Sequence, residues 1–175
     1  MFTSEQQIIR TLEAAFSQVH QRMESLPFLN PRLQVRALGF QPWQPYWLGV
    51  MVTPWFMNLM LLPGDESADV SRVGEAQSVN FPCGTFSFVA GHNHTIGSYL
   101  SCSLFSPVQE LESQQLAEEV ALASLNQLLG SKNPQEEHVS TRSGAHAAPR
   151  RQFFQRILGQ QINQQGAAKP WDVAE

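Results

Sequence analysis

Apolar residues recur every three or four positions over residues 4–24, which is the spacing of one face of an α-helix. The recurring positions are Ile8, Leu12, Ala15, Phe16, Val19 and Met23. Thr3 and Gln6 have the spacing of a capping box, in which each side chain serves a free backbone N–H. Pro27 and Pro31 end the pattern and open a loop. The chain is therefore predicted to begin with an amphipathic helix over 4–24.

From Leu33 to Phe105 the pattern changes to short apolar runs that are divided by Gly and Pro, as is typical of strands. The predicted strands are 33–40, 46–53, 55–62, 78–82, 85–90 and 97–105. In the fifth of these, phenylalanines alternate with Thr85, Ser87 and Val89, the period of a strand with one buried face. A turn at Pro82-Cys83-Gly84 makes residues 78–90 a predicted hairpin.

The most apolar stretch runs from Tyr46 to Gly64 and, at 19 residues, approaches the length of a transmembrane helix. Thr53-Pro54 interrupts it in the middle, and Asn58 lies in its second half. Because the proline disfavours helical geometry at Thr53, two buried strands joined by a turn fit better than one helix. We therefore expect no membrane span.

A second helical pattern follows a polar loop over 63–77 and the last predicted strand. Its apolar face comprises Leu116, Val120, Ala123, Ser124 and Leu128. Gly130 is a good stop, whereas two starts are possible, Ser106-Pro107 and Ser113. The predicted fold over residues 1–130 is an α+β domain with an N-terminal helix, a central antiparallel sheet of about five or six strands and a C-terminal helix.

Residues 131–175 differ in composition from the rest of the chain and are expected to form a mostly disordered tail. Residues 131–149 are small and polar, which is typical of a flexible linker. A short amphipathic basic segment follows at 149–159, where Arg150 and Arg151 precede apolar residues. The net charge is −6 over residues 1–130 and +2 over residues 131–175.

Composition excludes several classes of protein. Only 15% of the residues are charged and the net charge is −4, so the chain lacks the basic footprint of a nucleic-acid binder. Two cysteines in 175 residues do not make a disulfide framework. The first ten residues lack the basic and apolar regions of a secretory signal. We therefore expect a reduced, cytoplasmic protein.

Four side chains are candidate metal ligands: Cys83, Cys102, His92 and His94. The two cysteines lie 19 residues apart and no C-x₂-C pair occurs, so the spacing matches no standard site. Cys102 alternates with Leu100 and Leu104, which favours a buried position in a strand. We expect neither a metal nor another cofactor.

No motif predicts catalysis. The sequence contains neither a G-x-S-x-G nucleophile elbow nor a Gly-rich phosphate loop. Asp65, Glu66 and Asp69 fall in the polar loop and are expected to be solvated. The chain is therefore predicted to have no catalytic residues.

Aromatic residues gather around the turn at Thr53-Pro54. Five of them fall within 14 residues: Trp43, Tyr46, Trp47, Trp55 and Phe56. One interpretation is core packing beside proline-fixed turns. The other is an apolar groove for a peptide, because Trp and Tyr are favoured as anchors at binding surfaces.

Six motifs, in this order, resemble the HybE/HupJ/HoxT family of NiFe-hydrogenase maturation proteins. They are Phe28-Leu29-Asn30-Pro31, Trp47-Leu48-Gly49, Thr53-Pro54-Trp55-Phe56, Leu62-Pro63-Gly64, Phe81-Pro82-Cys83-Gly84-Thr85-Phe86 and Tyr99-Leu100-Ser101-Cys102-Ser103-Leu104-Phe105-Ser106-Pro107. The pair Arg150-Arg151 before apolar residues also resembles the family's C-terminus.

The resemblance implies a non-enzymatic chaperone for assembly of a membrane-bound uptake hydrogenase. Such a chaperone would hold the small-subunit precursor, with its twin-arginine export leader, until its clusters are inserted and the large subunit has docked. The large subunit and other maturation proteins are further expected partners. The residues expected to bind partners are Trp47, Thr53, Pro54, Trp55, Phe56, Phe105, Arg150 and Arg151.

Two alternatives stay open at this point. Cys83 and Cys102 could briefly hold iron or an iron–sulfur cluster for the small subunit, or the protein could be a structural subunit of the mature enzyme. The tail raises a separate hypothesis, because Arg150-Arg151-Gln152-Phe153-Phe154 resembles the core of a twin-arginine leader. The tail would then mimic the client leader and compete for its binding site.

Overall fold

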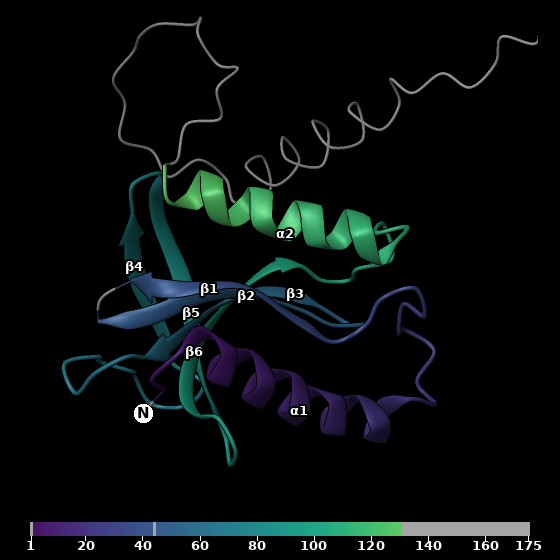
Figure 1. The fold of residues 1–175 in the computed structure, drawn as a ribbon, viewed down its shortest axis with the longest axis horizontal. Coiled ribbons are helices and arrows are strands. Elements are labelled where there is room, and N and C mark those ends of the chain that lie inside the picture. Colours follow the sequence, from purple (N-terminus) through teal and green to yellow (C-terminus); the bar gives the residue numbers. More distant parts are fainter. Residues whose placement is uncertain (1, 44, 131–175) are drawn as a thin grey trace, which may run out of the picture.

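The structure, a computed structural model, describes residues 2–43 and 45–130 (Figure 1). The elements are α1 (Glu5–Met23), β1 (Arg36–Trp43), β2 (Tyr46–Val52), β3 (Met57–Pro63), β4 (Ala76–Phe81), β5 (Gly84–Asn93), β6 (Gly97–Phe105) and α2 (Gln114–Leu128). This order confirms the predicted α+β fold. The predicted tail, with Arg150 and Arg151, lies outside the described residues. Among the described residues, neither helix is long and apolar enough to cross a membrane.

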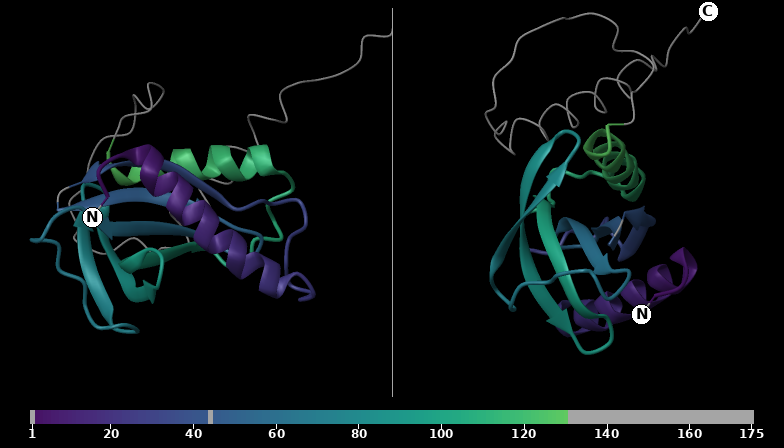
Figure 2. Two further views of the ribbon diagram at one scale, coloured as in Figure 1. Left: turned by 60° about the horizontal axis from the view of Figure 1, so that its bottom comes forward. Right: turned by 90° about the vertical axis from the view of Figure 1, so that its left-hand side faces the viewer.

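The six strands form one antiparallel sheet in the order β1-β2-β3-β6-β5-β4. Two meanders, β1–β2–β3 and β4–β5–β6, meet where β3 pairs with β6. The sheet curls, and its concave side holds α2 (Figure 2). Strands β1 and β4 are therefore the two edges of the sheet.

The helices cover opposite faces of the strands β1–β3 (Figure 1), which gives the domain two apolar cores. The larger core packs α2 against residues such as Leu48, Phe88 and Leu100. In the smaller core, Ile8 and Leu12 of α1 pack with sheet residues that include Phe40, Met51 and Met60. Because β2 and β3 are covered on both faces, they are almost continuously apolar, and the apolar stretch 46–64 is two buried strands as predicted.

Both helices begin at serine N-caps, which corrects the predicted start of the first helix and selects between the two for the second. The hydroxyl of Ser4, not of Thr3, accepts a hydrogen bond from the backbone N–H of Gln7 at 3.3 Å. The side chain of Gln7 in turn accepts from Thr3. At α2 the cap is Ser113, which accepts from Leu116 N–H at 3.1 Å. Ser106-Pro107 is not the start, because the chain after it first buries Val108 and Leu111 in a loop.

The strand bounds differ from the prediction mainly at β1, which runs over 36–43 instead of 33–40. Leu33 is buried before the strand begins. A bulge then shifts the register between Leu38 and Gln41, and Gly39 adopts a φ of +62° within it. The predicted hairpin of β4 and β5 is confirmed, with Phe81 paired to Gly84 across a two-residue turn.

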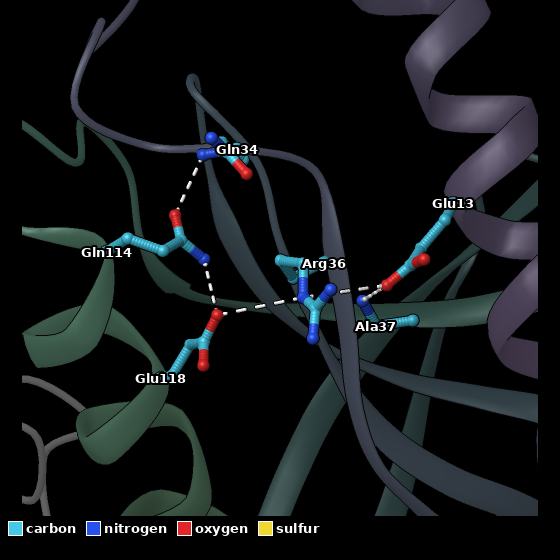
Figure 3. Close-up of polar contacts among 6 residues, drawn as sticks. All are labelled: Glu13, Gln34, Arg36, Ala37, Gln114 and Glu118. Atoms are coloured by element: carbon cyan, nitrogen blue, oxygen red, sulfur yellow. Dashed lines mark hydrogen bonds and ion pairs between the residues drawn. The ribbon is translucent and has the colours of Figure 1, made fainter.

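Side chains from both helices form hydrogen bonds to the backbone at the start of β1, the edge strand that lies between the two helices (Figure 3). A carboxylate oxygen of Glu13 on α1 accepts from Ala37 N–H at 3.2 Å. On the α2 side, Gln114 accepts from Gln34 N–H at 2.8 Å and donates to Glu118. Arg36 lies between Glu13 and Glu118, with its Nε 3.8 and 3.7 Å from their nearest oxygens. This edge is therefore closed to pairing with another strand.

Candidate partner-binding site

Thr53 organises the turn between β2 and β3 at the centre of the predicted site. The residue is fully buried, and its backbone N–H donates to the carbonyl of Phe56 at 2.9 Å. Its hydroxyl oxygen lies 3.3 Å from Trp55 N and 3.0 Å from Phe56 N, and accepts from both N–H groups. Pro54 is buried as well. Thr53 and Pro54 therefore shape the turn, and Trp55 and Phe56 are the residues it presents.

Asn30 joins this turn to two other loops. Its backbone N–H donates to the carbonyl of Pro54 at 2.7 Å. Its buried side-chain amide donates to the carbonyls of Val108 and Leu111, both at 2.9 Å, and its side-chain oxygen accepts from Arg32 N–H. One buried residue thus holds three loops together that are up to 81 positions apart in the sequence.

These loops bring motifs that are distant in sequence to one end of the domain, where α1 ends and α2 begins (right side of Figure 1). We call residues 24–31, 53–56 and 105–112 the α1–α2 end. A further bond within it runs from the amide of Gln109 to the carbonyl of Phe28, at 2.7 Å. The α1–α2 end is therefore a fixed arrangement of loops and not a set of independent segments.

Trp55 and Phe56 are half-buried against α1. The Phe56 ring meets Phe16 edge-to-face at 5.7 Å between centroids, and Trp55 lies 5.9 Å from the ring of His20. The two rings of the turn lie 5.5 Å apart, also edge-to-face. Each ring packs against the core beneath α1 and leaves some surface exposed, and a role of the two rings in binding a peptide stays a prediction.

Of the other predicted residues, Phe105 belongs to the α1–α2 end and Trp47 does not. Phe105 ends β6 and pairs with Met57, the residue that follows the turn. Trp47 lies six residues before Thr53 on β2, which places it roughly 20 Å away along the strand. There it pairs with Pro42 and Leu62 and packs into the core beneath α1.

The sequence analysis missed the most exposed apolar side chains of the α1–α2 end, Leu26 and Phe28. Their exposed fractions are 39% and 47%. The signal was present, because two large apolar residues flank Pro27 in a stretch without helical or strand periodicity. Exposed Glu110 and Glu112 flank buried Leu111 on the facing loop. The α1–α2 end therefore combines apolar side chains with carboxylates.

The structure separates the two cysteines that the iron-handling alternative requires to act together. Cys102 is buried in β6, and the register of Val89 with Ser101 places it level with Phe88. Cys83 lies five residues before Phe88, in the exposed β4–β5 turn, roughly 17 Å along the strand. Partial burial raises the pKa of the Cys83 thiol.

The candidate histidines and carboxylates lie elsewhere. His92 and His94 are at the tip of the β5–β6 hairpin, with 6.0 Å between ring centroids. Asp65 accepts from the Ser67 hydroxyl and from Ser67 N–H in an exposed turn, and these hydrogen bonds lower the pKa of its carboxyl group. Within residues 2–43 and 45–130, no three of His, Cys, Asp and Glu gather in a group that could hold a metal ion.

Comparison with known proteins shows to which class of protein this chain belongs. The family model described as "[NiFe]-hydrogenase assembly, chaperone, HybE" matches residues 7–156. The protein is thus of a non-enzymatic class, the assembly chaperones. Specifically, the chain belongs to the HybE/HupJ/HoxT family of [NiFe]-hydrogenase assembly chaperones. The match includes the six motifs and the pair Arg150-Arg151 that carried the resemblance in sequence, and it also includes most of α1.

Three relatives illustrate this membership. The Hydrogenase-2 operon protein HybE of Escherichia coli K12 is 32% identical over 138 residues, which cover 75% of this chain and 84% of that protein. The solution structure of HybE from Escherichia coli matches with a TM-score of 0.59 and 28% identity, covering 79% of this chain and 88% of that one. A Rhodobacter capsulatus protein named "Probable rubredoxin HupJ" is 31% identical over 131 residues, 73% of this chain. This chain spans only 47% of the length of that protein.

Proposed function

We propose that this chaperone binds the small-subunit precursor of a membrane-bound NiFe uptake hydrogenase through its twin-arginine leader. It acts in the cytoplasm and coordinates assembly with the large subunit before export. The observation that carries the proposal is the convergence of three family motifs at the α1–α2 end. At this end, aromatic and aliphatic side chains remain partly exposed on a hydrogen-bonded frame.

The chemistry of the proposed partner complements this domain. A twin-arginine leader offers two guanidinium groups followed by an apolar stretch. Residues 1–130 carry a net charge of −6, which favours approach of a cationic segment, and apolar side chains at the α1–α2 end can cover the stretch that follows it. Hydrogenase subunits are the natural clients of a hydrogenase-assembly family.

The test is co-purification from cells that express the tagged chain with the small-subunit precursor. Three precursors are compared: the full precursor, a leaderless form, and the leader fused to an unrelated folded protein. The proposal expects the full precursor and the leader fusion to be retained, with the leaderless form reduced at least tenfold. Equal retention of the precursor with and without its leader would contradict leader recognition, and retention of neither would contradict the whole proposal.

The positions of Cys83 and Cys102 do not favour the alternative function, in which these two residues would hold iron or an iron–sulfur cluster. The two thiols lie on different parts of the sheet, and one of them is buried. A colourless purified protein is therefore the expected result.

A further inference from the structure

Two of the exposed large apolar side chains lie on one short segment. Within the described residues, side chains of this kind are found at Leu26, Phe28, Val73, Val89 and Leu122. Leu26 and Phe28 flank Pro27, and Leu122 lies on α2. Val73 precedes Gly74, whose N–H donates to the carbonyl of Ala90 on β5, the residue after Val89. A single exposed apolar residue is common on a protein surface. Two such residues close together on one segment of the α1–α2 end indicate a surface for interaction.

The segment that carries Leu26 and Phe28 is fixed in place. Leu26 N–H donates to the carbonyl of Met23 at the end of α1, at 2.9 Å. The carbonyl of Phe28 accepts from Gln109, and Asn30 anchors the chain two residues later. A backbone held in this way loses little conformational freedom on binding, which favours its residues as anchors.

Carboxylates stand on the loop that contacts this segment. Glu110 and Glu112 are exposed next to Gln109, whose side chain holds Phe28. Within the described residues, neither glutamate makes an ion pair or a side-chain hydrogen bond. Arg22 precedes the segment at the end of α1, and Arg32 follows it after Pro31. The loop that carries Glu110 and Glu112 contacts the segment through Gln109, and it therefore places two carboxylates near the apolar pair.

We propose that Leu26 and Phe28 are the apolar anchors of a docking surface whose occupant is a peptide with arginines ahead of apolar residues. Glu110 and Glu112 face the arginines, and the two anchors contact the apolar residues that follow. This inference rests on the proposed function, and it assigns the leader of the small-subunit precursor to a particular surface. It also moves the contact away from Thr53 and Pro54, which are buried.

The test measures binding of a fluorescent synthetic leader peptide to the full chain by anisotropy. Phe28→Ser and Leu26→Ser should each weaken binding tenfold or more, as loss of an anchor does. Val89→Ser is the matched control, because Val89 is as exposed as Phe28, at 47%, but lies on β5. It should leave affinity unchanged. Thermal melts of all three variants show whether each one remains folded.

Charge is tested with Glu110→Gln and Glu112→Gln together, against Glu66→Gln and Glu75→Gln in the loop before β4. The first pair should weaken binding at low salt and reduce its salt dependence, whereas the control pair should do neither. Wild-type affinity in folded Phe28→Ser and Leu26→Ser would overturn the docking surface while leaving the proposed function intact. If the wild-type chain bound neither the leader peptide nor the precursor, the proposed function itself would fail.

The chain's own segment 149–159 has similar chemistry and is the competing occupant. A peptide of that sequence is therefore titrated in parallel against a chain that lacks residues 150–175. Binding of the leader peptide that depends on Phe28 supports the assignment. Binding of the 149–159 peptide alone, with the same dependence on Phe28, would overturn the client as occupant and favour the chain's own tail.

Discussion

Asn30 concentrates the polar interactions of the α1–α2 end in one residue. Its amide donates to the carbonyl of Leu111, and it also donates to the carbonyl of Val108, which accepts a second hydrogen bond from Leu111 N–H at 3.1 Å. Leaving such groups unpaired costs more than an average hydrogen bond contributes, because each one has already lost its contact with water. The residue is thus a structural requirement of the surface even though it is itself buried.

Replacing Asn30 by alanine is accordingly predicted to lower the free energy of unfolding by about 2–4 kcal/mol. Asn30→Asp should not restore stability, because a carboxylate cannot donate to the two carbonyls. Urea denaturation measures both. Asn80→Ala is the control: Asn80 is exposed and bonds only Thr85 in its hairpin, so the change should cost less than about 0.5 kcal/mol. Equal effects at the two positions would contradict the role given to Asn30.

The two cysteines are predicted to differ sharply in reactivity. In the native protein, a thiol reagent should modify Cys83 alone, and both thiols should react after denaturation. Burial raises the pKa of Cys83, so its rate should still be rising at pH values above about 8.5, where an ordinary thiol is half ionised. Rapid native modification of Cys102, followed by mass spectrometry, would show that β6 opens and would contradict its buried place.

At the scale of elements, the helices do more than cover the sheet, because their side chains also close the β1 edge. The contact of Glu13 with Ala37 N–H is a hydrogen bond to a buried residue, while its ion pair with Arg36 is long and partly exposed. Exposed ion pairs contribute little, whereas an unpaired buried N–H is costly. The hydrogen bond should therefore dominate.

This distinction predicts the effect of two substitutions at position 13. Glu13→Gln keeps an oxygen that can accept from Ala37 N–H, and it should change stability by less than about 0.5 kcal/mol. Glu13→Ala removes the acceptor, and it should cost about 1–2 kcal/mol. Thermal or urea unfolding distinguishes them. A loss in the glutamine variant as large as in the alanine variant would show that charge, not the cap, stabilises this edge.

Hydrophobic periodicity predicted the elements well, because every one of them has an apolar face. The two helices and the β4–β5 hairpin lie close to their predicted places, and the break at Thr53-Pro54 is a turn between strands. The start of β1 was misplaced because Leu33 is buried outside the strand, and burial alone does not identify secondary structure. At the bulge, Leu125 of α2 approaches Gly39 so closely that a Cβ there would lie 2.7 Å from its Cδ2, and no local pattern contains this approach.

The site was harder to predict than the fold. Trp47 and Trp55 were predicted to bind partners together because aromatic residues are dense around them in the sequence. Trp47 lies near the start of β2, however, whereas Trp55 lies in the turn after its end. The turn is also held from a different loop, because the backbone N–H of Asn30 donates to the carbonyl of Pro54. Leu26 and Phe28 carried only a weak signal, because exposure is set by the loops around them. These long-range contacts are what a single sequence does not reveal.

For the whole molecule, residues within 2–43 and 45–130 form two extensive apolar cores, which pack both helices on the sheet. A chain that ends at Gly130 is therefore predicted to fold on its own, with an unfolding midpoint within a few degrees of that of the full chain. Limited proteolysis should cut the full chain first within 131–149. Failure of the shortened chain to unfold cooperatively, or earlier cleavage in the sheet, would place the domain boundary elsewhere.

Amide hydrogen exchange of the full chain, alone and with the small-subunit precursor, tests the central claim most directly. It reports both whether the client binds and which surface it covers. We predict slower exchange over 24–32 and 105–113 in the complex, with no change in the loop 63–75 at the other end of the sheet. The contradictory result is unchanged exchange at the α1–α2 end, or protection confined to β4 and β5, while the precursor is bound.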